Sequence, residues 1–355
     1  MTPLEALLWP FSVVYGAAMR LRVWLYGAGI FRRHKLNGVV ISVGNVTVGG
    51  TGKTPMVLLL AERMVANGKR VAVLTRGYRG FLKGSGAGDF AIDDAVPNKG
   101  MGDEPELLRR RMAAQLHDLR QFGVFVGANR VANGRAAERD GFDCFLLDDG
   151  FQHLKLARDL DVVLIDASDP IGGGMVLPAG RLREPKSALQ RADIFVITRS
   201  THAPALEASL RRYSAAPVFY AVLRLDAILR ANETDQVVPE AEWKSRSYFA
   251  FCGIGNADSF FANLHEWGVN VIGTAKFPDH HLYSKGECAR IESEAKARGA
   301  DALICTEKDI CNMGAAWPSA LPVHCARVSL DLQSAEAFWA AARRIVAQRR
   351  PEIAS

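Results

Sequence analysis

Short apolar segments alternate with segments of helical spacing over most of the chain. Runs of apolar, often β-branched residues predict strands, and the amphipathic segments between most of them predict helices. The predicted strands cover residues 39–43, 70–75, 122–126, 143–147, 160–166, 192–198 and 217–223, and the predicted helices cover 54–66, 103–116, 129–139 and 202–213. This alternation predicts an α/β fold with a doubly wound parallel sheet that helices cover on both faces.

The alternation stops at a polar stretch and then resumes. Residues 226–246 contain the sequence RANETDQVVPEAEWKS and predict a connection between two domains. Strands are predicted again at 247–252, 269–275, 301–305 and 322–327, and helices at 257–267, 284–298 and 333–349. A chain of 355 residues is long for one domain. We therefore predict a larger domain over residues 37–225 and a smaller α/β domain over residues 247–355.

The first 36 residues differ from the rest because they are both apolar and basic. Apolar residues recur there at helical spacing, namely Leu4, Leu7, Leu8, Phe11, Val14, Tyr15, Ala18, Leu21 and Leu25. The uncharged run over residues 6–19 is shorter than the about 20 residues of a spanning helix, and no signal-peptide cleavage site follows. We interpret residues 1–36 as a helix that lies on a membrane surface. The alternative is a helix packed on the protein's own core.

Charge and cysteine content limit the possible partners. Residues 1–61 hold +5 of the chain's net charge of +6, which favours an anionic membrane surface. The basic residues do not form a polar face and no recognition motif accompanies them, so we expect no nucleic-acid partner. None of the six cysteines forms a C-x-x-C pair, which predicts buried reduced thiols rather than disulfides or a zinc site.

A phosphate-binding loop is predicted where the first strand meets the first helix of the larger domain. Residues 39–55 read VVISVGNVTVGGTGKTP, which places a Gly-rich loop and Gly-Lys-Thr between a strand and a helix. Backbone N–H groups of such a loop surround phosphates, Lys53 reaches the β- and γ-phosphates, and Thr54 ligates Mg²⁺. Thr47 replaces the first Gly of the strict pattern. An ordinary strand-to-helix turn would not explain the Lys-Thr pair.

A second acidic segment supports this interpretation. Residues 144–150 read CFLLDDG, an apolar strand that ends in Asp148 and Asp149. P-loop enzymes hold Mg²⁺ with an acidic residue at the end of a neighbouring strand. Asp-Gly is also a common turn signal, so the metal interpretation depends on the P-loop upstream.

Three other functions share part of this pattern. A regulatory ATPase or GTPase at the membrane would share the P-loop and the acidic pair, but the Asn-Lys-x-Asp segment typical of guanine recognition is absent, since Gly100-Met101 follow Asn98-Lys99. A membrane adaptor would explain only the N-terminal segment, and a soluble small-molecule kinase would not explain it. A kinase with a lipid substrate accounts for all three features.

Seven segments of the chain resemble the signature segments of one family, the tetraacyldisaccharide 4'-kinases that act in lipid A synthesis in Gram-negative bacteria. They are SVGNVTVGGTGKTP, Arg76-Gly77-Tyr78, Gly102-Asp103-Glu104-Pro105, DDGFQH at 148–153, LPAGRLREP at 177–185, FPDHH at 277–281 and TEKD at 306–309. The resemblance covers nearly the whole chain. It implies two α/β domains with the active site in the cleft between them, and ATP and Mg²⁺ as cofactors. It further implies phosphorylation of the 4'-hydroxyl of an acylated glucosamine disaccharide 1-phosphate, giving lipid IVA, by an enzyme on the cytoplasmic face of the inner membrane. We expect a monomer.

The resemblance also implies roles for single residues. Asp103 is the general base, His280 supports it from the second domain, and Lys53 is the third catalytic residue. From the residues alone, Asp103 and Glu104 are equally well explained as acids at a helix start, and His280 as part of a surface loop.

The remaining candidates form three groups. The predicted nucleotide-binding residues are Gly49, Gly50, Thr51, Gly52, Lys53, Thr54, Arg183 and Glu184; the metal ligands are Thr54, Asp148, Asp149 and Glu104; and the substrate residues are Tyr78, Arg130, Gln152 and His153. The alternatives are a surface ion pair for Arg183 and Glu184, buried polar contacts for Gln152 and His153, a solvated Arg130 and aromatic packing for Tyr78. Lys308 and Asp309 are interpreted as organising the second domain, outside the catalytic set.

Overall fold

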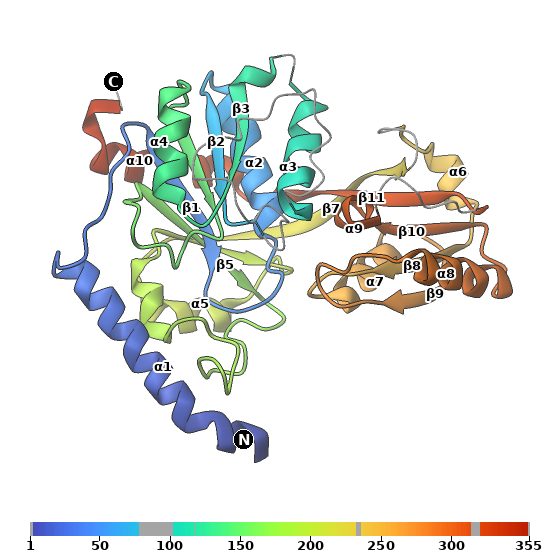
Figure 1. Ribbon diagram of the computed structural model, residues 1–355, viewed down its shortest axis with the longest axis horizontal. Coiled ribbons are helices and arrows are strands. Elements are labelled where there is room, and N and C mark those ends of the chain that lie inside the picture. Colours follow the sequence, from blue (N-terminus) through green and yellow to red (C-terminus); the bar gives the residue numbers. More distant parts are fainter. Residues whose placement is uncertain (1–2, 78–101, 117, 232–235, 314–319, 354–355) are drawn as a thin grey trace.

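One β-sheet runs through the whole molecule in the computed structural model, which describes residues 3–77, 102–116, 118–231, 236–313 and 320–353 (Figure 1). Over these residues the strand order is β3-β2-β4-β1-β5-β6-β7-β11-β10-β8-β9. The strands are β1 (Val39–Asn45), β2 (Val71–Thr75), β3 (Phe122–Val126), β4 (Cys144–Asp148), β5 (Leu160–Asp166), β6 (Ile194–Thr198), β7 (Val218–Arg230), β8 (Tyr248–Cys252), β9 (Val271–Lys276), β10 (Ala302–Thr306) and β11 (Val323–Leu332). The first seven strands all lie at the positions that the sequence predicts.

Helices cover both faces of this sheet, as the doubly wound fold requires. They are α1 (Pro3–Gly27), α2 (Lys53–Ala66), α3 (Asp103–Ala113), α4 (Arg130–Arg139), α5 (Pro204–Arg211), α6 (Glu240–Lys244), α7 (Ala257–Glu266), α8 (Lys285–Ala297), α9 (Glu307–Met313) and α10 (Ala335–Arg349). Adjacent residues of one strand point to opposite faces. Ile41 therefore joins the core under α2, α3 and α10, whereas Val40 joins the core under α4.

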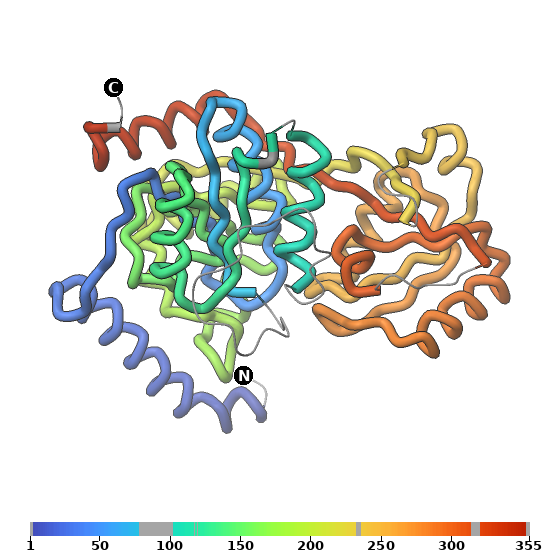
Figure 2. Tube along the Cα trace, turned by 45° about the horizontal axis from the view of Figure 1, so that its top comes forward, coloured from blue at the N-terminus to red at the C-terminus, as the bar shows by residue number. Residues whose placement is uncertain are grey.

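Two long strands connect the larger and smaller parts of the molecule (Figure 2). β7 pairs in parallel with β6 and antiparallel with β11, which pairs in parallel with β10. Both strands run further than predicted, β7 to Arg230 and β11 to Leu332. The polar residues in these extensions do not end the strands, because β7 and β11 form backbone hydrogen bonds with each other. The side chains of Arg224 and Asp331 also form an ion pair.

Three elements differ from the predicted domain organisation. Two helices were not predicted, namely α6, which lies inside the predicted connection, and α9, which begins at Glu307. α10 was assigned to the smaller domain, but Phe338 and Trp339 pack in the core of the larger part, and the ring of Phe338 meets Phe219 of β7 edge-on at 5.4 Å. The chain after β11 therefore returns to the larger part, which corrects the assignment of residues 333–349. The six cysteines are free, as predicted, and all except the half-buried Cys311 are buried.

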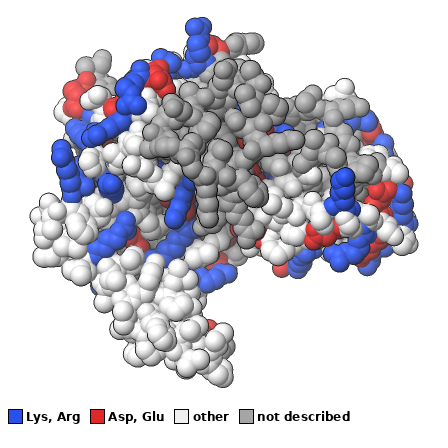
Figure 3. Space-filling model, in the orientation of Figure 1, with Lys and Arg blue, Asp and Glu red and all other residues white. Residues whose placement is uncertain are grey.

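The N-terminal helix α1 projects along the outside of the larger part (Figure 1). Ser12 and Gly16 are buried against the protein, and the Ser12 hydroxyl accepts a hydrogen bond from the backbone N–H of Ala179 at 2.9 Å. Eight large apolar residues of α1 are exposed, namely Leu4, Leu7, Trp9, Phe11, Val13, Val14, Leu21 and Trp24, whereas Leu8, Met19, Val23 and Leu25 are half-buried. This protrusion carries almost no charge in Figure 3. Over the described residues, no helix is long and apolar enough to span a bilayer.

Candidate active site

A cleft of about 980 Å³ lies where the carboxyl ends of the larger part's strands face the smaller part. Its walls come from the loop after β1, the end of β4, the start of α3, the loop after β9 and the start of α9. Open α/β sheets bind ligands at the carboxyl ends of their strands. The two parts of the molecule therefore contribute to one site.

The phosphate-binding loop forms one wall of this cleft. Gly49 has φ 126° and Gly52 has φ 84°, conformations that glycine adopts without a steric cost. Gly52 precedes α2, and no side chain caps the free N–H groups of that helix. Lys53 Nζ lies 3.4 Å from both Asn45 Oδ1 and the Gly49 carbonyl oxygen, so its charge is held inside the loop. Free N–H groups and a held ammonium are what an anionic phosphate requires.

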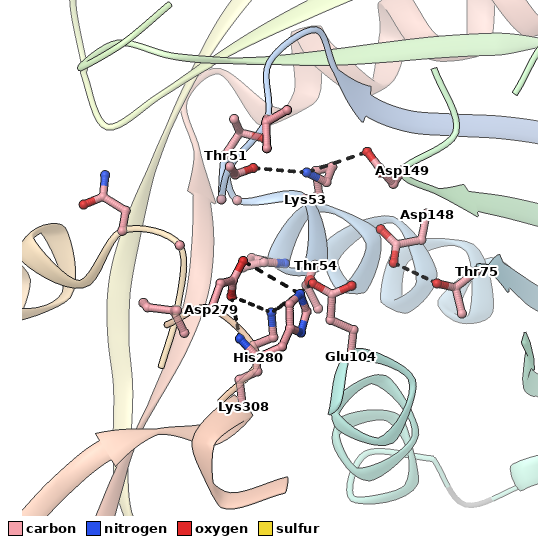
Figure 4. A pocket seen from close by; sticks show the side chains of 18 of the residues that line it. Thr51, Lys53, Thr54, Thr75, Glu104, Asp148, Asp149, Asp279, His280 and Lys308 are labelled. Carbon is pink, nitrogen blue, oxygen red and sulfur yellow. Dashed lines mark hydrogen bonds and ion pairs between the residues drawn. The ribbon is translucent and has the colours of Figure 1, made fainter. Parts of the chain in front are cut away.

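The two acidic residues after β4 lie in different surroundings (Figure 4). Asp148 is buried and accepts a hydrogen bond from the Thr75 hydroxyl at 3.3 Å. Burial, together with Glu104 and Asp149, raises the pKa of Asp148 to about 7. Burial also acts on Asp149, but Lys53 and Arg183 hold the pKa of that carboxyl below its ordinary value. The negative charge of Asp149 is thus balanced by Lys53 and Arg183. The carboxyl group of Asp148 instead lies near that of Glu104, which disfavours its ionisation.

On the opposite wall the structure brings Asp103 and His280 together. Asp103 is the first residue of α3 and is buried, and His280 lies after β9 with φ 58°. His280 Nδ1 lies 2.9 Å from each carboxylate oxygen of Asp103. Asn312 Nδ2 and the backbone N–H of Glu104 donate to the same carboxylate at 3.0 and 2.9 Å.

The charges of this pair depend on each other. The hydrogen bond that His280 donates to Asp103 raises the pKa of His280 above its ordinary value, although burial opposes this. Burial acts to raise the pKa of Asp103, but the hydrogen bond from His280 and the charge of Lys308 bring it below the ordinary value. Asp103 is therefore ionised near neutral pH, and its charge makes protonation of His280 more favourable than that of an ordinary histidine.

Comparisons with known proteins agree with this geometry. The model of the family described as tetraacyldisaccharide-1-P 4'-kinase matches residues 4–346. The tetraacyldisaccharide 4'-kinase of Geobacter metallireducens is 45% identical over 316 residues, covering 87% of this chain and 88% of the relative. That of Syntrophotalea carbinolica is 40% identical over 347 residues, covering 94% and 91%. The crystal structure of LpxK from Aquifex aeolicus in complex with ATP superposes with a TM-score of 0.72 at 30% identity, covering 97% of this chain and 99% of that one.

This chain belongs to the tetraacyldisaccharide 4'-kinase family. It is therefore a phosphotransferase with an alcohol group as acceptor, and the resemblance read from its seven sequence segments is confirmed.

Most of the remaining predicted residues of this kinase line the cleft. Arg130 is buried and donates to the Asp149 carbonyl oxygen at 3.0 Å. Gln152 Nε2 donates to the Asn45 carbonyl oxygen at 2.9 Å. Burial, followed by Arg130 and Arg158, lowers the pKa of His153 to about 4, so its ring is neutral. The predicted set is thus largely gathered at one place, although roles in binding stay predictions.

Two of the predicted residues that the structure describes are not among those that line the cleft, namely Asp103, which is buried behind His280, and Glu184. Glu184 is fully buried and pairs with Arg191, and it does not line the cleft with its neighbour Arg183. Its side chain instead contacts Arg191, so the structure places it away from the cleft, and its role as a nucleotide ligand stays a prediction. Tyr78 lies outside the described residues.

Sequence reasoning missed several residues that line the cleft of this kinase. Tyr15 and Arg22 of α1 enter it, and Arg22 donates to the Gln152 carbonyl oxygen at 3.0 Å. Arg199 follows β6 and donates to the Gly50 carbonyl oxygen of the phosphate-binding loop at 3.1 Å. No motif marks these positions, because their contacts form only when distant segments pack together.

The TEKD segment contributes one residue to the fold and another to the cleft. Asp309 is buried and accepts hydrogen bonds from Gly253 N, Tyr283 Oη and Thr306 Oγ1 at 2.7, 2.8 and 2.6 Å. Asp309 therefore holds three segments of the smaller part together, as predicted from its place after a strand. Lys308, placed outside the catalytic set by the sequence, lines the cleft instead.

Proposed function

We propose that this kinase transfers the γ-phosphate of ATP to the 4'-hydroxyl of a tetraacyl glucosamine disaccharide 1-phosphate, forming lipid IVA. One observation carries the proposal. The phosphate-binding loop with Lys53 lines one wall of the cleft, and His280, which contacts the buried Asp103 carboxylate directly behind it, lines the other. One wall supplies the groups that bind a triphosphate, and the other supplies a carboxylate for an acceptor hydroxyl.

The wall opposite the phosphate-binding loop supplies the base. As the bond between the 4'-oxygen and Pγ forms, the bond from Pγ to the β,γ-bridging oxygen breaks and ADP leaves. The hydroxyl proton passes to the Asp103 carboxylate, which is ionised and within a hydrogen-bonded frame. His280 holds that carboxylate and balances its charge. Lys53 lies on the phosphate side of the cleft, where negative charge gathers during transfer.

The residues present fit Mg²⁺ as the metal. No cluster of three or more His, Cys, Asp or Glu stands ready for a metal over the described residues. Mg²⁺ in kinases needs fewer protein ligands, because it binds through one or two carboxylates together with substrate phosphates and water. Asp148 is buried beside the acidic Glu104, and the resulting high pKa marks a place where a cation is favourable. Asp148, Glu104 and Thr54 would hold Mg²⁺, with Asp149 beside them. When bound, Mg²⁺ neutralises charge on the β- and γ-phosphates.

A membrane location on the cytoplasmic face of the inner membrane accompanies this function. The exposed apolar face of α1 lies next to the cleft, since Tyr15, Met19 and Arg22 of the same helix line it. A helix that rests in the interface would hold the acyl chains of the substrate in the bilayer while the disaccharide enters the cleft.

Nucleotide turnover with and without the acceptor tests the proposal. The purified chain in detergent is given ATP and Mg²⁺, first alone and then with the acylated disaccharide 1-phosphate. We expect ADP to form only when the acceptor is present. Equal ADP formation in both reactions would identify a regulatory ATPase instead and contradict the kinase proposal.

A further inference from the structure

A lysine of the smaller part lines the wall of the cleft opposite Lys53, beside His280 and Asp279 (Figure 4). Lys308 lies in the first turn of α9, and its side chain is only 15% exposed. Its Nζ lies 3.2 Å from Glu104 Oε1 and 3.5 Å from Asp279 Oδ1. The same atom lies 3.7 Å from Asp103 Oδ2 and 3.5 Å from His280 Nε2. The ammonium group of Lys308 thus lies beside the Asp103–His280 pair and beside Glu104, a predicted metal ligand.

We propose that Lys308 is a further catalytic residue, whose ammonium group contacts the transferred phosphoryl group from the wall opposite Lys53. This inference rests on the proposed kinase function.

Asp103 does not need Lys308 to hold it in place. Its carboxylate already accepts hydrogen bonds from His280 Nδ1, Asn312 Nδ2 and the backbone N–H of Glu104, all at 2.9 to 3.0 Å. Lys308 Nζ is further away, at 3.7 Å, which is an ion-pair distance rather than a hydrogen bond. Positioning of the base therefore does not explain this lysine.

The nearest carboxylate to Lys308 belongs to Glu104, which is also a predicted ligand of Mg²⁺. Glu104 is among the residues that would hold Mg²⁺, and a carboxylate that ligates a metal is less available to an ammonium group. Lys308 then retains Asp279, which is 41% exposed, and faces the cleft. The γ-phosphate brings new negative charge to this place. We infer that Lys308 exchanges Glu104 for a phosphate oxygen when ATP and the metal are bound.

A cation at this position would stabilise the negative charge on the phosphoryl group during its transfer. Charge spreads over the three equatorial oxygens of the transferred group while the bond from the 4'-oxygen to Pγ forms and the bond from Pγ to the β,γ-bridging oxygen breaks. The proton goes to Asp103, and ADP leaves with the electron pair of the broken bond. A cation that a separate segment supplies at this stage raises turnover by about 10³–10⁵ in other phosphoryl-transfer enzymes. Lys308 would supply this cation from α9 of the smaller part, whereas Lys53 belongs to the larger part.

The test compares Lys308→Met with wild type in three measurements. We expect kcat to fall by about 10³, while the Kd of ADP stays within threefold. Aluminium fluoride with ADP and Mg²⁺ mimics the transferring group, and we expect Lys308→Met to lose at least about 100-fold in affinity for this complex. Lys308→Arg keeps the charge and should recover at least tenfold of the lost turnover. The control is Lys276→Met, because Lys276 is exposed and pairs with Asp258 outside the cleft.

Two results would overturn the inference. One is a kcat of Lys308→Met within threefold of wild type. The other is an equal loss of affinity for ADP alone and for the fluoride complex, since a structural role weakens both. If Lys308→Met does not fold by circular dichroism, Lys308→Gln against Lys308→Arg applies the same criteria. The fluoride measurement needs no lipid acceptor, so it still reports on Lys308 if acceptor-dependent turnover is absent and the proposed function fails.

Discussion

The phosphate-binding wall of the cleft comes from one short segment, whereas the opposite wall joins residues far apart in the chain. Residues 49–54 lie in one loop and the first turn of α2. Asp103 and His280 are 177 positions apart and meet only because the β7–β11 pair holds the two parts of the molecule together. A local segment can bind phosphate by itself, but the contact between Asp103 and His280 forms only in the assembled fold. Changes in the two walls should therefore have different kinetic signatures.

The largest effect is expected in the assembled wall. Asp103→Asn keeps the shape of the side chain but cannot accept the hydroxyl proton, and it should lower kcat by about 10²–10⁴ with little change in ATP affinity. His280→Ala should also lower kcat, and the double variant should lose less than the product of the two single losses, because the two groups act as a unit. Steady-state kinetics of the three variants measures this coupling. His265→Ala is the control, since His265 is exposed on α7. Fully multiplicative losses would show that the two residues act independently.

A somewhat smaller effect is expected in the local wall. Lys53→Ala and Thr54→Ala should each lower kcat by about 10²–10³, because the lost groups meet charge that develops during transfer. Unlike the Asp103 variant, Lys53→Ala should also weaken ATP binding, since it removes a cation from the phosphate site itself. Isothermal titration with a non-hydrolysable ATP analogue separates the two effects. Lys69→Ala, which changes an exposed lysine that pairs with Asp143, is the control. Turnover of either site variant within a few-fold of wild type would contradict the phosphate-site assignment.

The metal site between the walls should respond to pH. The pKa of Asp148 is raised to about 7, above its value in an unfolded chain of about 4. Without metal, this group lowers the stability of the folded state as pH rises between those values, because only the unfolded chain ionises freely. Mg²⁺ competes with the same proton, so its affinity should rise roughly tenfold between about pH 6 and pH 8.

Calorimetric titration of Mg²⁺ in the presence of ADP measures this change. Asp148→Asn should abolish most of the pH dependence. Asp149→Asn should keep most of it, since burial and Glu104, the two larger causes, still raise the pKa of Asp148. A pH-independent affinity in the wild type would remove Asp148 from the metal site.

The smallest effect concerns α1, which lies on the larger part alone. Leu7→Asp and Phe11→Asp change exposed apolar residues and should reduce binding to vesicles that contain anionic lipid by several-fold without lowering thermal stability. High salt should weaken binding of the intact chain, because the neighbouring Arg20 and Arg22 are basic. Val237→Asp is a matched control, as Val237 is equally exposed but lies outside α1. Unchanged sedimentation of both α1 variants with vesicles would refute the surface-helix interpretation.

The contrast between local segments and contacts of distant residues also explains which features the sequence predicts. The strands of the larger part and the phosphate-binding loop follow from local apolar patterns and from the order strand, Gly loop, Lys-Thr and helix. The lengths of β7 and β11 did not follow, because their polar residues are kept in strands by pairing with each other. The return of α10 to the larger part is likewise decided by packing of Phe338 and Trp339. Lys308 was left out of the site because only tertiary contacts bring its Nζ to Glu104.

The most direct test of the central claim is the transfer of label from γ-labelled ATP to a defined tetraacyl disaccharide 1-phosphate, followed by determination of the labelled position. We predict one labelled phosphate at the 4'-oxygen, formed by the wild-type chain and at least about 100-fold more slowly by Asp103→Asn or Lys53→Ala. Label that appears only as free phosphate, or at another hydroxyl, would contradict the assignment of the two walls to nucleotide and acceptor.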